Sequence, residues 1–364
     1  MHLLEPRANS SQLMRWAGPP IAILLTLLAA SALFAILDKP PLQAFYVFFI
    51  EPLETANGWS ELALKASPLI LIAQGLALGF RARVYNIGAE GQLLMGAVFA
   101  SGVAIYTDGL NAWWILPMMI LAGALGGALW GSLSAWLKTH FNADETLTTL
   151  MLTYVATYVL SYLVSGPWRD PGGTNFPQSI MFGESAMFEP LFDGLRLNSS
   201  IFITIVAVPL FWLFVSRSFR AYQLAVGGLA PAAARYAGFS ARSGVWISLV
   251  ISGLTAGLAG AMEAAGPVGQ LTLSLSPGYG YAAIIVAWVG RLHPIGIVLS
   301  GLLLALIYLG GEAAQVSMQL PSAISWLFQG MLLFFLLGVD VFVDYRFRRR
   351  RDKRLMSSEE GANA

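Results

Sequence analysis

Ten apolar runs follow one another along the chain, separated by short segments that carry most of its charged residues. Most runs are long enough to cross a bilayer, because a helix needs about 20 apolar residues to span the hydrocarbon core. Cut to within a few residues, the runs are 16–37, 62–80, 88–107, 112–137, 146–165, 198–216, 243–263, 279–290, 294–311 and 322–343. The pattern predicts an all-α polytopic membrane protein with about ten transmembrane helices in one bundle.

Two runs need a separate interpretation. The run 279–290 is too short to cross as a regular helix, so the sequence predicts a short or broken span there. Such backbone is tolerated only where protein or a water-filled cavity shields it. The first run, 16–37, ends without a small-residue cleavage site, which predicts an uncleaved helix rather than a signal peptide.

Lysine and arginine gather on one side of these spans. Seventeen of the 21 Lys and Arg residues fall on that side, and the exceptions are Lys39, Lys65, Arg169 and Arg196. Because cytoplasmic loops retain Lys and Arg, that side is predicted to be the cytoplasm. The asymmetry predicts a multi-pass protein of a bacterial inner (plasma) membrane, and the even number of crossings places both termini in the cytoplasm.

This topology divides the chain into a transmembrane domain, 1–345, and a basic cytoplasmic tail, 346–364. The domain has a long inside loop, 217–242, and an outside loop, 166–197, that is dense in turn-forming residues at its start. A basic run directly after the last span is typical of an anchor on anionic membrane lipid. We therefore expect the tail to contact lipid and not nucleic acid.

Composition supports the membrane assignment and narrows the chemistry. Apolar residues make up 57% of the chain and charged residues 11%, against about 25% in soluble domains. There is no cysteine, and the three histidines have no glutamate at metal-site spacing, so the sequence predicts no metal site, cofactor or catalytic residue. It also lacks a Gly-x-x-x-x-Gly-Lys stretch, so ATP is not bound by a P-loop on this chain.

Glycines recur at helix-packing spacing in two of the runs. Gly123, Gly127 and Gly131 lie four residues apart, as do Gly253 and Gly257. In lipid, small residues at this spacing allow helix backbones to approach closely. The pattern predicts tight helix pairs and carries no information on function.

The inside loop contains a stretch, 227–238, that predicts a short helix. Pro231 suits a first helical turn, and Gly238 can end the helix in the left-handed conformation. A helix of about two turns is not stable alone in water, so it must dock on something. The pattern leaves open a connector on the membrane surface or a partner-binding element.

A second polar stretch, Asn86-Ile87-Gly88-Ala89-Glu90-Gly91-Gln92, opens the run 88–107. One interpretation is a helix start, with Asn86 as N-cap and Glu90 at the positive end of the helix dipole. The other is a polar break lining a translocation route or inner gate, with Asn86, Glu90 and Gln92 facing away from lipid. The topology places the stretch nearer the cytoplasmic side.

Five segments, spread over most of the chain, resemble the permease subunits of ABC importers of the branched-chain amino acid, ribose and nucleoside superfamily. The stretch 86–92 is similar to a signature of that family. Residues 142–145 with 149–152, then 166–167 with 177–179, and 278–281 with 286–296, resemble the longer of two paired permeases in its nucleoside branch. The inside loop is similar to the family's ATPase-coupling element at Gly228, Ala233, Ala234, Arg235, Tyr236 and Gly238.

The resemblance implies an ATP-driven importer of nucleosides or related sugar-containing solutes. Its partners would be ATPase subunits inside, a second permease subunit, and an extracytoplasmic substrate-binding protein. Tyr279, Tyr281 and Trp288 would lie along the route and stack on a base or sugar ring. The alternative for these aromatic residues is interfacial anchoring.

The chain departs from the family pattern at several positions. Ala230 and Ala232 flank Pro231 where polar residues are usual, Asp144 and Thr153 replace Asn, and alanine stands at 282 and 283 where Asp is frequent. These changes leave ribose-like sugars or branched-chain amino acids as alternative solutes. An ion-coupled secondary transporter is a further alternative, although no carboxylate lies clearly at the centre of a run.

Overall fold

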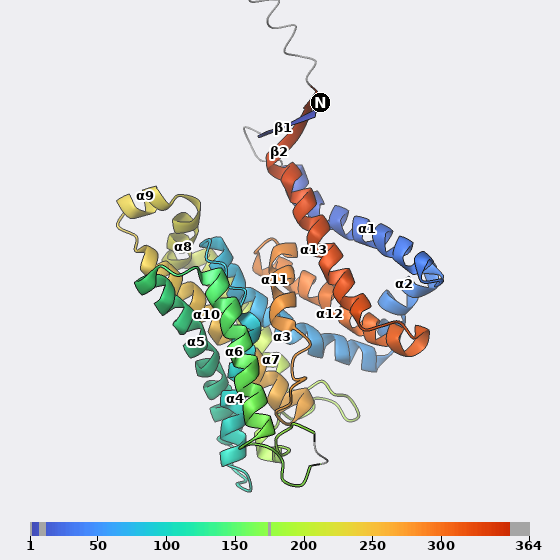
Figure 1. The fold of residues 1–364 in the computed structure, drawn as a ribbon, viewed down its shortest axis with the longest axis vertical. Helices are drawn as coiled ribbons and strands as arrows, with labels where there is room; N and C mark the ends of the chain where they lie inside the picture. The colour runs from blue at the N-terminus through green and yellow to red at the C-terminus, as the bar shows by residue number, and fades with distance from the viewer. Residues whose placement is uncertain (1, 7–11, 174–175, 350–364) are drawn as a thin grey trace, which may run out of the picture. The chain divides into compact units, whose positions relative to one another are not determined.

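The computed structural model describes residues 2–6, 12–173 and 176–349, and its internal contacts divide the chain into two compact units (Figure 1). Unit 1 comprises the two ends of the chain, Met1–Tyr46 and Met318–Ala364, and unit 2 comprises Val47–Ser317. The part of the predicted tail at 350–364 lies outside the described residues. Each unit is described by itself.

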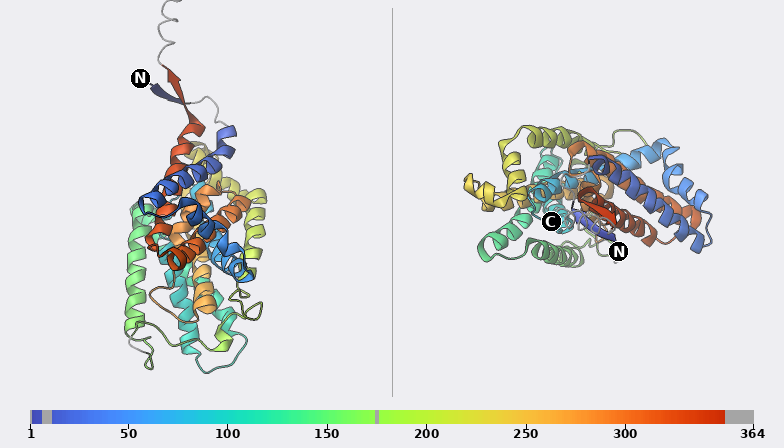
Figure 2. Two further views of the ribbon diagram at one scale, coloured as in Figure 1. Left: turned by 90° about the vertical axis from the view of Figure 1, so that its right-hand side faces the viewer. Right: turned by 90° about the horizontal axis from the view of Figure 1, so that it is seen from above.

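Unit 1 contains β1 (His2–Pro6), α1 (Gln12–Ile36), most of α2 (Pro41–Phe49), α13 (Ala323–Asp344) and β2 (Tyr345–Arg349). Helices α1 and α13 pack together, with the rings of Phe34 and Phe328 5.8 Å apart. Strands β1 and β2 pair antiparallel, with His2 opposite Arg349 (Figure 2). The start of α1 and the end of α13 therefore lie at the same end of unit 1.

Unit 2 is a helical assembly around one central helix. Its elements are η1 (Glu51–Leu53), α3 (Ala56–Arg81), α4 (Ala89–Tyr106), α5 (Ile115–Phe141), α6 (Glu145–Ser165), η2 (Glu184–Ala186), α7 (Ile201–Arg217), α8 (Phe219–Leu229), α9 (Pro231–Tyr236), α10 (Ala241–Glu263), the π-helical turn Ala264–Val268, α11 (Tyr279–Val289) and α12 (Pro294–Met318). Helix α10 packs against α3, α4 and α5, which makes it the centre of the unit.

The contact between α5 and α10 follows the predicted glycine spacing. A methyl group added at Gly127 would lie 2.2 Å from the carbonyl oxygen of Gly253, and one at Gly257 equally close to that of Gly123. No side chain fits at such distances, so the two backbones are in direct contact. The prediction of tight helix pairs from these glycines is confirmed.

All ten predicted runs are helical in the structure, but fewer of them qualify as full spans. Among the described residues, seven helices are long and apolar enough to cross a membrane, or eight if α7 and α8 are counted as one. These two helices are bent by 68°, at Ser218, whose hydroxyl accepts a hydrogen bond from Arg220 N at 3.1 Å. Helix α11 and the apolar part of α13 are shorter. The all-α membrane fold is confirmed, and the count of about ten is loose because hydropathy does not reveal bends.

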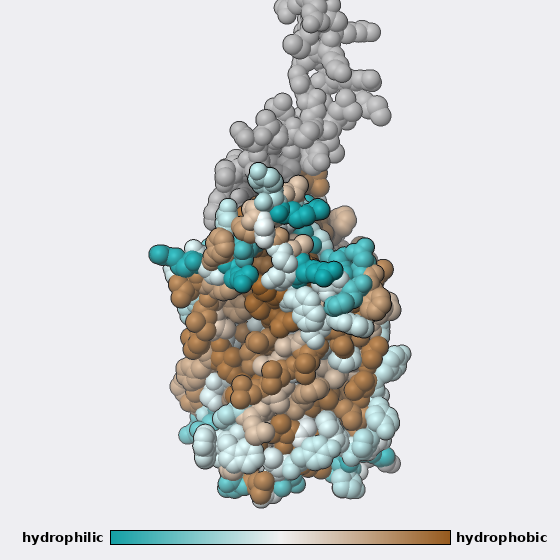
Figure 3. Space-filling model, turned by 90° about the vertical axis from the view of Figure 1, so that its left-hand side faces the viewer, coloured by the Kyte–Doolittle hydropathy of each residue, from teal (hydrophilic) through white to brown (hydrophobic). Residues whose placement is uncertain are grey.

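One face of unit 2 carries an apolar stripe. The exposed large side chains of α5 recur every three or four residues, at Met118, Leu121, Leu125, Leu129 and Leu133. Figure 3 shows this side of the molecule, with a hydrophobic band between more hydrophilic zones at its two ends. An apolar helix face of this kind suits contact with acyl chains.

Candidate translocation route and coupling surface

The connector between α3 and α4, residues 82–88, is not helical and carries the first predicted route residue. Asn86 is 2% exposed, and its amide nitrogen donates to Gln92 Oε1 at 2.8 Å and to Ser252 Oγ at 2.7 Å. Its side-chain oxygen accepts from Gly88 N at 2.9 Å. The structure thus joins Asn86 and Gln92 in one buried network.

Of the two interpretations of this stretch, the part that makes Asn86 the N-cap of the following helix is wrong. Helix α4 begins at Ala89, and Gly88 precedes it without a side-chain cap. The Asn86 side chain instead closes a local turn onto Gly88, while its amide reaches α10. Side-chain bonding of this kind competes with helix formation. With Asn86 as N-cap the helix would start at Ile87, whereas α4 starts two residues later, at Ala89.

The polar connector lies beside the middle of α10 and not beside its first turn. Ser252, which bonds Asn86, is eleven residues beyond Ala241, the first residue of α10. At 1.5 Å per residue this corresponds to roughly 16 Å of helix. The sequence placed the stretch nearer the cytoplasmic side; the structure places it at the mid-length of the central helix.

Glu90 holds the start of the short helix α11. Its carboxylate is 7% exposed and accepts a hydrogen bond from Gly280 N at 2.7 Å. The Ser276 hydroxyl accepts from Tyr279 N at 3.1 Å, at the same helix start. Because a helix N-terminus carries unpaired N–H groups and partial positive charge, a carboxylate there is strongly favoured. A methyl group at Gly280 would lie 2.2 Å from Glu90 N, so α4 and α11 are in backbone contact.

The three predicted aromatic route residues have different surroundings. Tyr279 is 4% exposed and packs edge-on against Tyr308, with ring centroids 5.7 Å apart. Tyr281 is 39% exposed. Both lie in the first turn of α11, near Glu90. Trp288 lies in the last turn and stacks on Phe80, with centroids 5.6 Å apart, so the structure does not bring it to the same place.

A second polar group lies at the end of unit 2 opposite the inside loop, and the sequence analysis did not assign it a role. Lys65 Nζ pairs with Glu312 Oε1 at 2.9 Å, and Arg196 Nη1 with Glu61 Oε1 at 3.3 Å. Glu263, at the end of α10, is also buried there. One signal was available, since Lys65 and Arg196 are two of the four exceptions to the charge asymmetry.

The predicted short helix of the inside loop is present as α9. It starts at Pro231, and Gly238 follows it with φ +77°, so both predicted signals are confirmed. Arg235 and Tyr236 are exposed, the latter by 97%. Gly238 and Ala233 are exposed as well. Helix α9 lies at the periphery of unit 2 (Figures 1 and 2).

Two of the predicted coupling residues are buried against unit 2 and not exposed like Arg235 and Tyr236. Ala234 is 5% exposed, and Gly228 is buried against the end of α3, where a methyl group would lie 2.3 Å from the carbonyl oxygen of Arg81. Gly228 therefore allows α8 to contact the end of α3. The loop has one face docked on its own unit and one face free of it.

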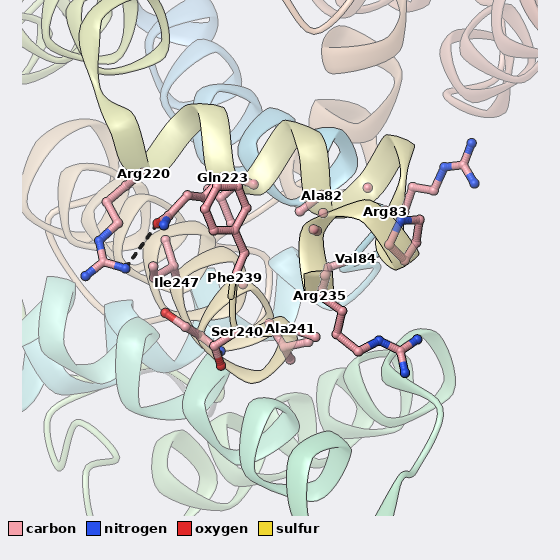
Figure 4. A pocket seen from close by; sticks show the side chains of 18 of the residues that line it. Ala82, Arg83, Val84, Arg220, Gln223, Arg235, Phe239, Ser240, Ala241 and Ile247 are labelled. Atoms are coloured by element: carbon pink, nitrogen blue, oxygen red, sulfur yellow. Dashed lines mark hydrogen bonds between the residues drawn. The ribbon is translucent and has the colours of Figure 1, made fainter. Parts of the chain in front are cut away.

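A pocket of about 500 Å³ opens beneath this loop, between α8, α9, the start of α10 and the α3–α4 connector (Figure 4). Arg83 and Arg235 lie at one end of the view and Arg220 at the other, with Phe239 between them. Arg220 Nη1 donates to Gln223 Oε1 at 3.2 Å. Basic side chains thus border a pocket with many small and apolar residues.

The α5–α6 turn forms another part of this rim. Lys138 pairs with Glu145 at 2.8 Å, and both line the pocket. Asp144 caps α6 by accepting from Leu147 N at 3.0 Å. That backbone hydrogen bond, with a smaller contribution from the positive charge of Lys138, holds the pKa of Asp144 below its ordinary value.

Comparison with known proteins gives the chain relatives of one kind. The sequence model of a family described as "Branched-chain amino acid transport system / permease component" matches residues 58–337. A glucose ABC transporter permease of Haloferax volcanii is 32% identical over 96% of this chain and 94% of its own length.

Two further relatives match over most of their length. A guanosine ABC transporter permease of Bacillus subtilis is 29% identical over 71% of this chain and 75% of its own length. A nucleoside ABC transporter permease of Lactococcus lactis is 25% identical over 80% of this chain and 82% of its own length.

Proposed function

The chain belongs to the family of permease components of branched-chain amino acid transport systems, and we propose that it imports nucleosides or related sugar-containing solutes. It is a transmembrane permease subunit, as its relatives are. The observation that carries the solute class is that these relatives are named for glucose, guanosine and nucleosides. A sugar ring is common to all of them. Ribose-like sugars fall within this class, and branched-chain amino acids are the alternative that the family description keeps open.

ATP is hydrolysed by a separate subunit of the importer. This chain carries no P-loop sequence, and its family comprises transport components and not enzymes. ATP binding and hydrolysis change the conformation of that partner. This change must therefore be transmitted to the spans through a contact on the cytoplasmic side.

The loop formed by α8 and α9 makes that contact. Arg235 and Tyr236 offer a cation and an aromatic ring to a partner. The Tyr236 side chain is 97% exposed, so it makes few contacts within its own chain and is available to a partner. Gly228 connects the same loop to the end of α3, which leads into the Asn86 connector. Movement of α9 would therefore reach the connector through the end of α3.

The partners outside this chain are a second permease subunit and an extracytoplasmic substrate-binding protein, besides the membrane lipid. Family membership supports the ATPase and the binding protein. The exposed apolar side chains on α6, among them Leu147, Met151 and Tyr158, offer surface to a second permease or to lipid.

The chain lies in the inner membrane of a bacterial cell with both termini in the cytoplasm. Two observations support this topology. Seventeen of the 21 Lys and Arg residues fall on the same side as the α8–α9 loop in the predicted topology. The pairing of β1 with β2 places the two chain ends at the same end of unit 1.

Reconstitution tests the proposal. The chain is co-purified with its ATPase and second permease, placed in liposomes, and supplied with the binding protein and labelled guanosine or glucose. We expect accumulation of at least one of these solutes that requires ATP and is lost when the ATPase carries a substitution in its catalytic glutamate.

The same chain reconstituted alone is the control. It should not concentrate either solute, with ATP or with a proton or sodium gradient. Uphill uptake by the single chain under an ion gradient would overturn the ATP-driven function and favour a secondary transporter.

A further inference from the structure

The C-terminal end of α3 lies between α8, the first helix of the α8–α9 loop, and the short helix α11 (Figure 1). Helix α3 ends at Arg81, which is half-buried. The backbone of this residue contacts one of these neighbours and its side chain contacts the other. Arg81 therefore connects the loop with α11.

The backbone of Arg81 is in direct contact with α8. A methyl group added at Gly228 would lie 2.3 Å from the carbonyl oxygen of Arg81 and 3.0 Å from the carbonyl carbon of Ala82. No side chain fits at these distances, whereas the neighbouring Gly227 has open space around it. Because close-packed atoms transmit strain, a displacement of α8 toward α3 must displace the end of α3.

The side chain of Arg81 reaches the turn between α11 and α12. Its Nε donates to the carbonyl oxygen of Leu292 at 3.1 Å, and its Nη2 donates to the same oxygen. Both donors belong to a charged group, which makes these hydrogen bonds stronger than those between neutral groups. The oxygen lies just beyond Val289, the last residue of α11, where the helix dipole favours a cation. Arg81 therefore holds the C-terminal end of α11.

Two neighbouring contacts attach the same part of α3 to α11 and α12. The rings of Phe80 and Trp288 stack with centroids 5.6 Å apart. Gln74 Nε2 donates to the carbonyl oxygen of Pro294 at 2.9 Å. The start of α11 is held separately, by Glu90 of α4. Because the two ends of α11 are attached to different helices, a displacement of α3 relative to α4 would tilt α11.

The turn that Arg81 holds has an uncommon backbone conformation. Arg291 and Leu292 are consecutive residues other than glycine, with φ of +56° and +54°. This left-handed region is costly for L-residues, which adopt it singly and seldom in succession. Such a conformation persists only where surrounding contacts hold it, and it is typical of segments that change conformation. The hydrogen bonds from Arg81 are contacts of this kind, so their release allows the turn to relax.

We propose that Arg81 is a positioning residue for transport, which transmits movement of the α8–α9 loop to α11 through its hydrogen bonds to Leu292. The inference rests on the proposed function, in which a partner ATPase contacts this loop, and it names the residue through which α11 responds. The first turn of α11 carries Tyr281, one of the predicted route residues. Loop movement therefore reaches the predicted route at α11 as well as at the Asn86 connector.

The nucleotide dependence of thiol labelling at α11 tests this role. Tyr281→Cys, at a position that is 39% exposed in a chain without cysteine, is the reporter. The whole importer in nanodiscs is treated with a water-soluble maleimide, without nucleotide and with ATP on an ATPase whose catalytic glutamate is substituted. We expect the labelling rates of the two states to differ by about fivefold or more, the lower end of typical coupling between sites.

The first test variant is Arg81→Gln in the reporter chain. It removes the charge and the forked donors, so the labelling rates of the two states should become equal. Arg81→Lys keeps the charge without the fork and should give an intermediate ratio of rates. Arg217→Gln, at an exposed arginine that likewise ends its helix, is the matched control and should keep the wild-type ratio. A merely structural defect would change both rates and leave their ratio intact.

The contact with α8 provides a second test, which stands even if Arg81→Gln fails to assemble. Gly228→Ala should force α8 away from the end of α3 and lower the ratio of labelling rates. Gly227→Ala, in open space on the same helix, should keep the wild-type ratio. The double variant of Arg81→Gln and Gly228→Ala should be affected no more than Arg81→Gln, because both changes interrupt one path.

A wild-type ratio of labelling rates in Arg81→Gln or in Gly228→Ala would overturn this role of Arg81. Equal rates in the two states of the reporter chain without further changes would overturn it as well, since α11 would then not move. These results leave the proposed function intact as long as the wild-type complex concentrates guanosine or glucose with ATP. Absence of ATP-driven uptake of both solutes by the wild-type complex would instead contradict the proposed function itself.

Discussion

At the scale of the residue, Glu90 bonds a backbone amide 190 positions further along the chain. Gly280 N, in the first turn of α11, has no acceptor within its own helix, so a carboxylate from α4 accepts its hydrogen bond. Glu90, the only acid in the Asn86–Gln92 stretch, therefore has a structural role as acceptor for Gly280 N. Whether the stretch also lines a route or gate stays a prediction.

Removing this contact should weaken the start of α11. Glu90→Ala leaves a buried N–H without an acceptor, which costs about 1–3 kcal/mol of folding stability. Glu90→Gln keeps an acceptor and loses only the charge, for about 0.3–1 kcal/mol. Thermal unfolding of the purified protein in detergent should rank wild type above Gln and Gln above Ala. Glu189→Ala, on an exposed carboxylate, should unfold like wild type, and an unchanged transition in Glu90→Ala would deny Glu90 this role.

At the scale of the element, α9 is a helix of six residues whose end depends on one glycine. Gly238 has φ +77°, a conformation that costs an L-residue about 1–2 kcal/mol and a β-branched residue more. The exposed face beyond it bears Arg235 and Tyr236, while Gly228 and Ala234 face unit 2. A substitution at Gly238 should therefore distort the end of α9 and shift its exposed face, while the spans stay folded.

We expect Gly238→Val and Arg235→Glu to uncouple the importer. Both complexes should remain in the membrane, yet their ATPase activity should no longer rise when the loaded binding protein is added. Gly227→Val, in open space within α8 and at negative φ, controls for the first change. Arg242→Glu, on an exposed cation of α10, controls for the second. Normal stimulation in both test variants would make the loop a passive connector.

At the scale of the whole molecule, the connector before α4 is closed in the structure described. Asn86 and Gln92 are 2% and 1% exposed, beside the middle of α10. A gate made from this segment must open in another state of the importer. The chain has no cysteine of its own, which makes accessibility measurable at single introduced sites.

Labelling of Asn86→Cys and Gln92→Cys by a water-soluble thiol reagent from the cytoplasmic side should depend on the nucleotide bound to the ATPase. Reaction is expected in one nucleotide state and not in the other. Arg242→Cys, exposed, should react in both states, and Ala256→Cys, fully buried, in neither. If neither test site reacts in any state and Glu90→Gln transports normally, the segment has a structural role only.

The sequence alone fixed those features that depend on local composition. Apolar runs located ten of the thirteen α-helices that the structure describes, because a segment in lipid must satisfy its own backbone hydrogen bonds and a helix does so. Pro231 and Gly238 located α9, since both act through their own backbone geometry. The shortness of the run 279–290 predicted a half-length helix, and α11 spans 11 residues. Family resemblance on the same sequence then indicated the importer.

Tertiary structure decided everything that requires two distant segments to meet. Only the fold pairs Asn86 with Ser252, Glu90 with Gly280, and Lys65 with Glu312. It also places the polar stretch at the start of α4 beside the middle of α10. Burial and hydrogen bonding of a side chain depend on neighbours that the chain supplies from elsewhere, and no local pattern contains them.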